Sequence, residues 1–185
     1  NCESQLVPLC AQLFWSKTVE NAMKTSVDAL AAVETSIEDS LKTLATAVLS
    51  EQPALRRKKL EELIKEFVHL REVTRSLIRD PSVIESIQST GVKTTPYRWL
   101  SNMRLQYDEN QVNHEERLSL HIANTAFLYG YEYLGVQESL VKTPLTDRCY
   151  LTMTQALQYK LGGSPFGPCP KSVVWPRARP DCAIS

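Results

Sequence analysis

Apolar side chains recur at helical spacing from about residue 27 to residue 79, and this period constrains the fold more than any other feature. Leu30, Ile37 and Leu44 lie seven residues apart. From 54 to 79 the spacing alternates between three and four residues, at Leu60, Leu63, Phe67, Leu70, Thr74 and Leu77. Such seams are typical of helices packed on helices, as a short antiparallel pair or as a bundle.

Polar and proline residues divide this helical part into separate helices. Thr25–Ser26 predicts a break between two helices rather than one long rod. Pro53 suits the first turn of the next helix, because its missing N–H would be unpaired there anyway. That helix, on the order of 40 Å long, should end at Asp80–Pro81, since a residue before proline avoids the helical conformation.

The period changes after a polar connector at 82–96, for which we expect no more than one helical turn. Residues 99–107 and 118–127 alternate between apolar and polar side chains, and the strongly polar run 108–116 between them predicts a turn or loop. Alternation of this kind is typical of half-buried strands. The sequence therefore predicts a mainly α fold, a helical bundle followed by a short β segment.

The stretch 142–168 combines a loop, a helix and a glycine pair. Thr146 or Asp147 can cap the helix, because a short side-chain oxygen accepts from the free N–H groups of the first turn. Gly162-Gly163 should end it, since glycine readily takes the left-handed conformation of a C-terminal cap. Between these limits Cys149, Met153, Ala156, Leu157 and Leu161 share one helix face.

Composition excludes several classes of function. Lysine plus arginine equals aspartate plus glutamate, 21 of each, which argues against a nucleic-acid partner. No long apolar run indicates a membrane span. The five cysteines show no metal-ligand spacing and are odd in number, so we expect no metal site, no disulfide framework and a reducing compartment. His69 is interpreted as a partly exposed helix residue beside the apolar stripe, and His121 as a satisfied surface histidine.

Three strings near the C-terminus carry a family resemblance. YGYEYLG at 129–135, TPLTDRCYLTMTQAL at 143–157 and LGGSPFGP at 161–168 resemble the start of the first AAA+ module of dynein heavy chains. Residues 55–78 and 99–107 resemble the end of the linker that precedes this module. The amino-acid sequences of these strings are more similar to cytoplasmic than to axonemal heavy chains.

The resemblance implies both a domain plan and a function. Residues 1–96 would be a helical linker segment, 97–128 a β segment between linker and motor, and 129–168 the edge of an incomplete α/β AAA+ module. The family consists of ATP-driven, minus-end-directed microtubule motors, in which this segment wraps the adenine of the nucleotide. The implied adenine contacts here are Pro144, Leu145 and Thr146.

Partners, cofactor and location follow from the same resemblance. The implied partners are the rest of the motor ring, the dynein intermediate and light chains, and microtubules. The implied cofactor is ATP with magnesium in the full-length family. The implied location is the cytoplasm, on the microtubule cytoskeleton.

The sequence departs from the family after Gly167-Pro168. Dyneins continue there into a Walker A loop, whereas this chain reads Cys169-Pro170-Lys171-Ser172. Pro170 has no N–H to offer to a phosphate and holds its own φ near −65°. We therefore expect no catalytic residues, no tight ATP binding and no hydrolysis from this chain alone, which also lacks Walker B carboxylates.

The proline-rich tail at 169–185 is expected to be disordered, and the chain to be a piece of something longer. Two alternatives remain open at this stage. The first is a non-catalytic helical interaction module that uses the seams of 27–79. The second is a piece of an axonemal or ciliary-transport heavy chain.

Overall fold

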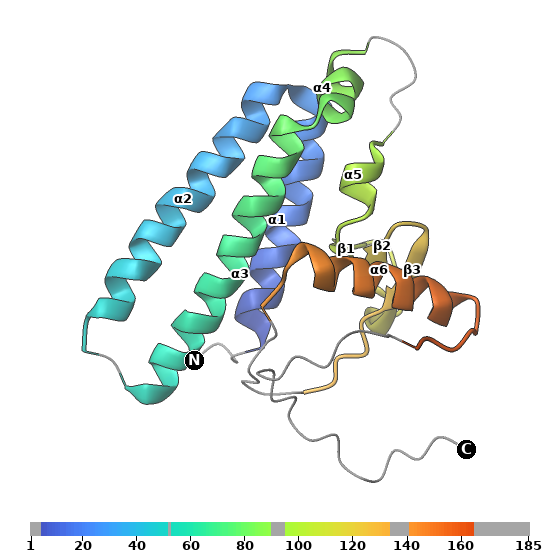
Figure 1. Ribbon diagram of the computed structural model, residues 1–185. Helices are drawn as coiled ribbons and strands as arrows, with labels where there is room; N and C mark the ends of the chain where they lie inside the picture. The colour runs from blue at the N-terminus through green and yellow to red at the C-terminus, as the bar shows by residue number, and fades with distance from the viewer. Residues whose placement is uncertain (1–4, 52, 90–94, 134–140, 165–185) are drawn as a thin grey trace.

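Three long helices form an up-down-up bundle along one side of the molecule (Figure 1). The computed structural model describes residues 5–51, 53–89, 95–133 and 141–164. The bundle comprises α1 (Leu6–Thr25), α2 (Val27–Leu49) and α3 (Ala54–Arg79). This confirms the predicted helical part and the break at Thr25–Ser26. Ser26 caps α2, its hydroxyl accepting from the amide N–H of Ala29 at 3.1 Å.

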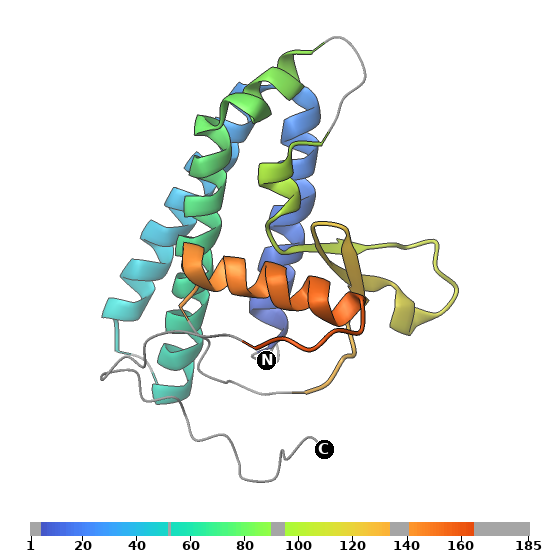
Figure 2. The same cartoon turned by 45° about the vertical axis from the view of Figure 1, so that its right-hand side comes forward.

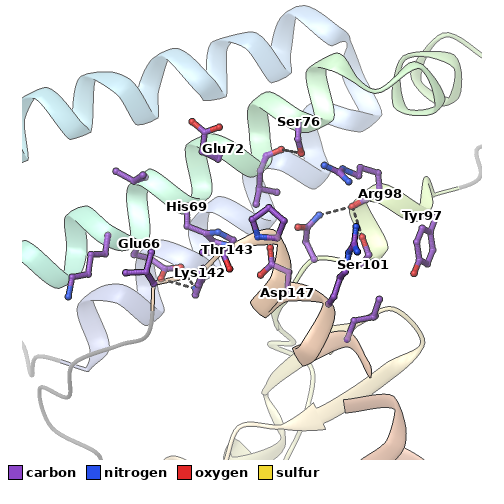
Figure 3. A pocket seen from close by; sticks show the side chains of 18 of the residues that line it. Glu66, His69, Glu72, Ser76, Tyr97, Arg98, Ser101, Lys142, Thr143 and Asp147 are labelled. Atoms are coloured by element: carbon purple, nitrogen blue, oxygen red, sulfur yellow. Dashed lines mark hydrogen bonds and ion pairs between the residues drawn. The ribbon is translucent and has the colours of Figure 1, made fainter. Parts of the chain in front are cut away.

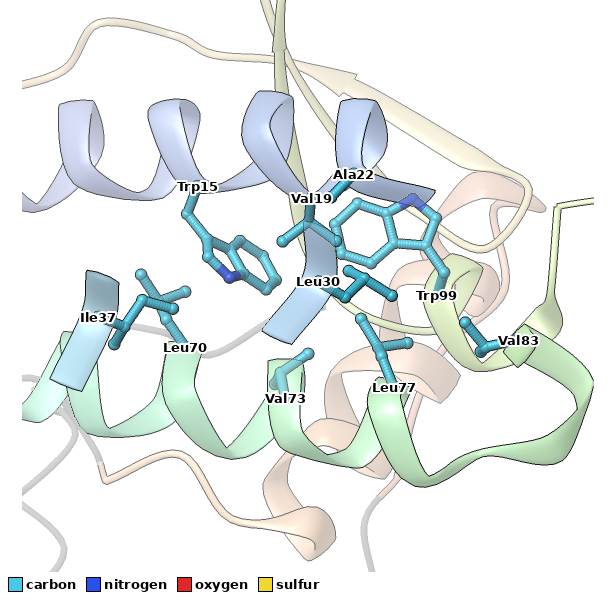
Figure 4. Packing of buried hydrophobic residues seen from close by; sticks show 10 residues of the cluster. All are labelled: Trp15, Val19, Ala22, Leu30, Ile37, Leu70, Val73, Leu77, Val83 and Trp99. Atoms are coloured by element: carbon cyan, nitrogen blue, oxygen red, sulfur yellow. The ribbon is translucent and has the colours of Figure 1, made fainter. Parts of the chain in front are cut away.

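The core of the bundle contains two tryptophans and part of the predicted seam, namely Leu30, Ile37, Phe67, Leu70 and Leu77 (Figure 4), whereas Leu44, Leu60 and Leu63 lie outside it. Leu30, Leu70 and Leu77 are fully buried. The Trp15 and Trp99 rings lie 5.3 Å apart between centroids, at an interplanar angle of 59°. The Trp15 indole N–H donates to the Thr74 hydroxyl at 3.0 Å, so the buried polar atom of this ring is satisfied.

Two short helices follow the bundle, α4 at its top and α5 lower at its side (Figure 1), and both differ from the prediction. Helix α4 (Pro81–Gln88) makes two turns where no more than one was expected. Asp80 explains this, because it ends α3 and also caps α4, accepting from the Ser82 amide at 2.9 Å. Helix α5 (Tyr97–Leu100) occupies the start of the predicted strand 99–107, because Trp99 is drawn into the bundle core.

A three-stranded antiparallel sheet, in the order β1-β2-β3, follows the helices. Its strands are β1 (Arg104–Tyr107), β2 (Leu118–Ile122) and β3 (Thr125–Leu128), with a 3₁₀ turn at His114–Glu116 between the first two. The predicted strand at 118–127 is therefore wrong as a single run. Ala123 takes the left-handed conformation (φ 49°) and turns the chain back after Ile122.

The sheet docks on α1 through its first strand. The Leu105 amide donates to the buried hydroxyl of Ser16 at 3.2 Å. The Gln106 side chain donates to Glu20 at 3.3 Å. The first contact satisfies one backbone N–H of an edge strand, and the second joins two side chains. The β segment is thus attached to the bundle by polar contacts as well as by apolar packing.

Helix α6 (Pro144–Gln158) runs crosswise to the bundle, from a start beside α3 to a far end beside the sheet (Figures 1 and 2). It begins earlier than predicted, because Thr143 rather than Thr146 or Asp147 is the cap. Its end also differs. Lys160 takes the left-handed conformation (φ 57°) that was expected of the glycines. The tail at 169–185, which was predicted to be disordered, lies outside the described residues.

Candidate functional site

The start of α6 carries the three residues predicted to contact adenine, and a reciprocal cap fixes its backbone. The Thr143 amide donates to the Thr146 hydroxyl at 2.7 Å, and the Thr146 amide donates to the Thr143 hydroxyl at 3.3 Å. Pro144 occupies the first helical position, where its missing N–H leaves no gap. This capping box holds the first turn of the helix in one conformation.

An ion pair ties this first turn to the helical bundle. The Lys142 ammonium donates to both carboxylate oxygens of Glu66 on α3, at 2.9 and 2.8 Å. The two side chains are only 17% and 13% exposed. Lys142 directly precedes the cap residue Thr143, so the pair places the start of α6 against α3.

A cavity of about 720 Å³, which we call the α3–α6 cavity, lies beside this ion pair (Figure 3). Helix α3 contributes Glu66, His69 and Ser76 to its wall, and the start of α6 faces them. Its apolar lining comes from Ile64, Val68, Val73, Val141, Pro144 and Leu151. A concave, largely apolar space with a few convergent polar groups is typical of small-molecule sites.

Burial dominates the electrostatics of the cavity wall. It lowers the pKa of His69 to about 4, and the nearby Lys142 ammonium lowers it further in the same direction. His69 is therefore neutral near pH 7. Burial also raises the pKa of the Asp147 carboxyl, against the opposing attraction of Lys142 and Arg98. The cavity thus contains one neutral imidazole and one carboxyl that ionises less readily than usual.

The three predicted adenine contacts occupy different environments. Pro144 lines the α3–α6 cavity. Leu145 is 71% exposed and lies outside the cavity lining. The Thr146 hydroxyl is engaged in the cap and also donates to the Thr143 carbonyl at 2.8 Å. Adenine contact by these residues stays a prediction.

Sequence reasoning missed the side of the cavity that α3 provides. His69 is the partly exposed helix residue that the sequence predicts, but its place in the cavity wall was not predicted. A signal was present, because Glu66, His69, Glu72 and Ser76 recur at three- and four-residue spacing on a face beside the apolar seam. The segment that packs against this face could not be inferred from the sequence, since Glu66 and Lys142 lie 76 positions apart.

Other classes of site find no support in the described part of the chain. Within residues 5–51, 53–89, 95–133 and 141–164 no three metal-binding side chains gather at one place. No described helix is both long and apolar enough to span a bilayer. Tyr129 and Tyr131 pack edge to face, 5.2 Å between ring centroids, and the Tyr129 hydroxyl accepts from Gln5 at 2.8 Å.

Comparison with known proteins shows the same relatives along nearly the whole chain. Residues 129–171 match the family described as the hydrolytic ATP binding site of the dynein motor region. The chain is 49% identical over 173 residues to the cytoplasmic dynein heavy chain of Drosophila melanogaster, covering 90% of this chain. It is 46% identical to that of Caenorhabditis elegans and 43% identical to that of Dictyostelium discoideum, covering 89% and 91% of this chain.

The chain spans only 4%, 3% and 4% of the length of these three relatives. Each of these similarities covers about nine-tenths of this chain, so both the helical bundle and the C-terminal segment resemble the same heavy chains. The chain therefore belongs to the dynein heavy chain family, as a fragment whose residues 129–171 match the motor region.

Proposed function

We propose that this chain supplies the end of the linker and the adenine-side edge of the first AAA+ module in a cytoplasmic dynein heavy chain. On this proposal 1–96 and 97–128 belong to the linker and its junction, and 129–168 begins the module. One observation carries the proposal. The match to the hydrolytic ATP binding site of the dynein motor region begins at residue 129 and includes all of α6.

The start of α6 suits contact with a flat, uncharged ring. Leu145 presents an exposed apolar side chain, and Pro144 stiffens the backbone beside it. Thr146 contributes by fixing the turn, because its hydroxyl already makes hydrogen bonds inside the cap. Apolar contact and a preorganised backbone would together bind adenine without any charged group.

The motor activity belongs, on this proposal, to the whole heavy chain. That chain would move along microtubules in the cytoplasm by hydrolysing magnesium-bound ATP, together with the rest of the motor ring and the intermediate and light chains. The present chain alone would neither bind ATP tightly nor hydrolyse it. The resemblance places Pro170 where the family has the glycine before the Walker A lysine, and a proline there offers no N–H to a phosphate and fixes its own φ.

Two measurements test the proposal. The purified 185-residue chain should release no phosphate from ATP and show no micromolar affinity for a fluorescent ATP analogue. Micromolar binding or steady phosphate release would overturn the expected inactivity of the isolated chain.

In a full-length heavy chain in which residues 1–168 of this chain are followed by an intact Walker A loop, Leu145→Ala should weaken nucleotide binding several-fold, because it removes apolar contact with the base. Thr35→Ala, at an exposed position on α2, is the matched control and should leave nucleotide binding unchanged. Equal nucleotide affinities for the two variants would contradict the adenine-side assignment.

A further inference from the structure

The Glu66–Lys142 ion pair joins two parts of the chain to which the proposed function gives different tasks. Glu66 lies in the middle of α3, in the part assigned to the linker. Lys142 lies one residue before the cap of α6, in the part assigned to the nucleotide module. Both carboxylate oxygens accept from the one ammonium group, within 2.9 Å.

We propose that Glu66 and Lys142 are positioning residues for nucleotide binding, which hold the adenine-side turn against α3 in its binding conformation. The inference rests on the proposed function and adds to it the device that sets the turn in place. Neither side chain needs to touch the nucleotide. Each acts through Thr143 and the capping box, whose place relative to the bundle the ion pair defines.

The burial of this pair separates it from an ordinary surface ion pair. The Lys42–Asp39 pair on α2 is 74% and 65% exposed, so solvent screens it and its loss should change little. Lys142 and Glu66 are both mostly buried, and removal of either partner leaves a poorly solvated charge without its counter-ion. Such a charge would move toward solvent and take the adjoining turn with it.

The charges around the pair favour the arrangement in which Lys142 contacts Glu66. His69 lies one helical turn beyond Glu66 and its pKa is lowered to about 4, so near neutral pH it adds no second positive charge beside Lys142. The other charged residues that line the same cavity are Lys65, Glu72, Arg98, Asp147 and Arg148. Lys142 is the cation that pairs with Glu66, at 2.8 Å, whereas the neighbouring Lys65 pairs with Glu62 at 2.7 Å.

Thermodynamic linkage gives the expected consequence. If nucleotide binds better to the turn held against α3, nucleotide binding and ion-pair formation must favour each other by the same factor. Loss of the pair should then weaken nucleotide binding about five-fold, the lower end of typical couplings between sites. Turnover at saturating ATP should change little, because neither side chain reaches the phosphates on this proposal.

The test uses a full-length heavy chain in which residues 1–168 of this chain are followed by an intact Walker A loop, with four variants. Lys142→Met keeps the aliphatic stem without the charge, Glu66→Gln keeps the shape without the charge, and the double swap Glu66→Lys with Lys142→Glu restores an ion pair in reverse. Lys42→Met is the control at the exposed pair. The readouts are the dissociation constant for a fluorescent ATP analogue, and KM and kcat for ATP hydrolysis.

We expect each single variant at the buried pair to raise the dissociation constant and KM about five-fold with kcat nearly unchanged. The double swap should recover to within about two-fold of the wild type, and Lys42→Met should match the wild type.

Two outcomes would overturn the inference. The first is wild-type nucleotide affinity in both single variants while Leu145→Ala still weakens it, which leaves the proposed function standing. The second is a double swap as weak as the single variants, because it shows that disruption rather than pairing caused the loss. Wild-type affinity in Leu145→Ala and in both charge variants would instead remove the proposed function itself.

Discussion

The bundle and helix α6 are held in place by different kinds of interaction. Val19, Leu30 and Leu77 at the bundle centre are wholly buried. Helix α6 buries no residue completely, and its apolar side chains at 145, 153 and 157 remain exposed. It is fixed instead by a cap, by the Lys142–Glu66 ion pair and by contacts of its far end with β3.

This difference separates two sources of stability. Apolar burial supplies the bundle with a large, non-directional driving force. Helix α6 depends on directional contacts, each worth far less, and an amphipathic helix without a partner for its apolar face gains little from propensity alone. The apolar face of α6 therefore contributes little to stability within this segment, and its position is set by its first turn. The following substitutions test that division.

The largest contrast should come from equal truncations on the two sides. Leu77→Ala removes a side chain that is 0% exposed and should lower the free energy of unfolding by about 2–5 kcal/mol. Leu157→Ala, at 64% exposure on α6, should change it by less than about 0.5 kcal/mol. Urea unfolding followed by tryptophan fluorescence measures both. Similar losses in the two variants would mean that α6 shares the bundle core after all.

The next test addresses a polar contact inside the apolar core. Thr74→Val keeps the shape of the side chain but leaves the Trp15 indole N–H without an acceptor, which should cost about 1–3 kcal/mol. Thr35→Val is the matched control, because the Thr35 hydroxyl only donates to the Ala31 carbonyl on the exposed face of α2. The same urea titration measures both. If Thr74→Val were no more destabilising than Thr35→Val, the buried hydrogen bond would carry no stability.

The bundle was predictable from sequence because its signals are local and repeated. The helix at 54–79 and the break at Thr25–Ser26 follow from spacing and from one polar pair. The missed features depend on distant partners or on unusual backbone. Trp99 lies in a helix rather than the expected strand, because its side chain packs in the bundle core. Ala123 and Lys160 adopt left-handed conformations, which are uncommon for residues other than glycine and so were not predicted.

Only the part of the candidate site that α6 provides could be predicted from the sequence. The start of α6 could be found from its sequence string, although not its correct cap. The wall that faces it could not, because nothing local to Glu66 or His69 indicates a partner near residue 142. Long-range pairing of this kind is decided by tertiary packing, which periodicity does not encode.

His69 should make the stability of the chain depend on pH. Its pKa is about 4 in the folded chain and near 6.5 in an unfolded one, so the unfolded state binds more protons between these values. The contribution of neutral His69 to the free energy of unfolding is therefore fully present above about pH 6.5 and is lost as the pH falls toward 4. Because His69 is only half-buried, we expect a loss on the order of 1–2 kcal/mol after solvent screening.

The contribution of His69 can be isolated by substitution. Asp147 acts in the opposite direction, since its raised pKa lets the folded state hold its proton more tightly. The measurement is therefore the difference between the wild type and His69→Gln in urea unfolding from pH 7 to pH 4. His114→Gln, at an exposed position, is the control. Parallel pH profiles for the wild type and His69→Gln would contradict the burial of this imidazole.

The smallest effect should appear at the end of α6, where a lysine occupies a conformation that suits glycine. Lys160 has φ 57°, and the next amide, of Leu161, donates to the Ala156 carbonyl at 2.8 Å in the closing turn. Lys160→Gly relieves the steric cost of the β-carbon, partly offset by the entropy of glycine, and should stabilise this end by about 0.5 kcal/mol. Hydrogen exchange of the α6 amides is the measurement, because global unfolding reports mainly on the bundle.

The matched substitution Lys17→Gly, at an exposed lysine inside α1, should have the opposite sign. It places glycine in a right-handed helix and should cost about 1 kcal/mol, now visible in global unfolding. Slower exchange in α6 for Lys160→Gly beside lower global stability for Lys17→Gly would show that the two regions are separately held. Faster exchange in α6 for Lys160→Gly would mean that the lysine side chain itself secures the end of the helix.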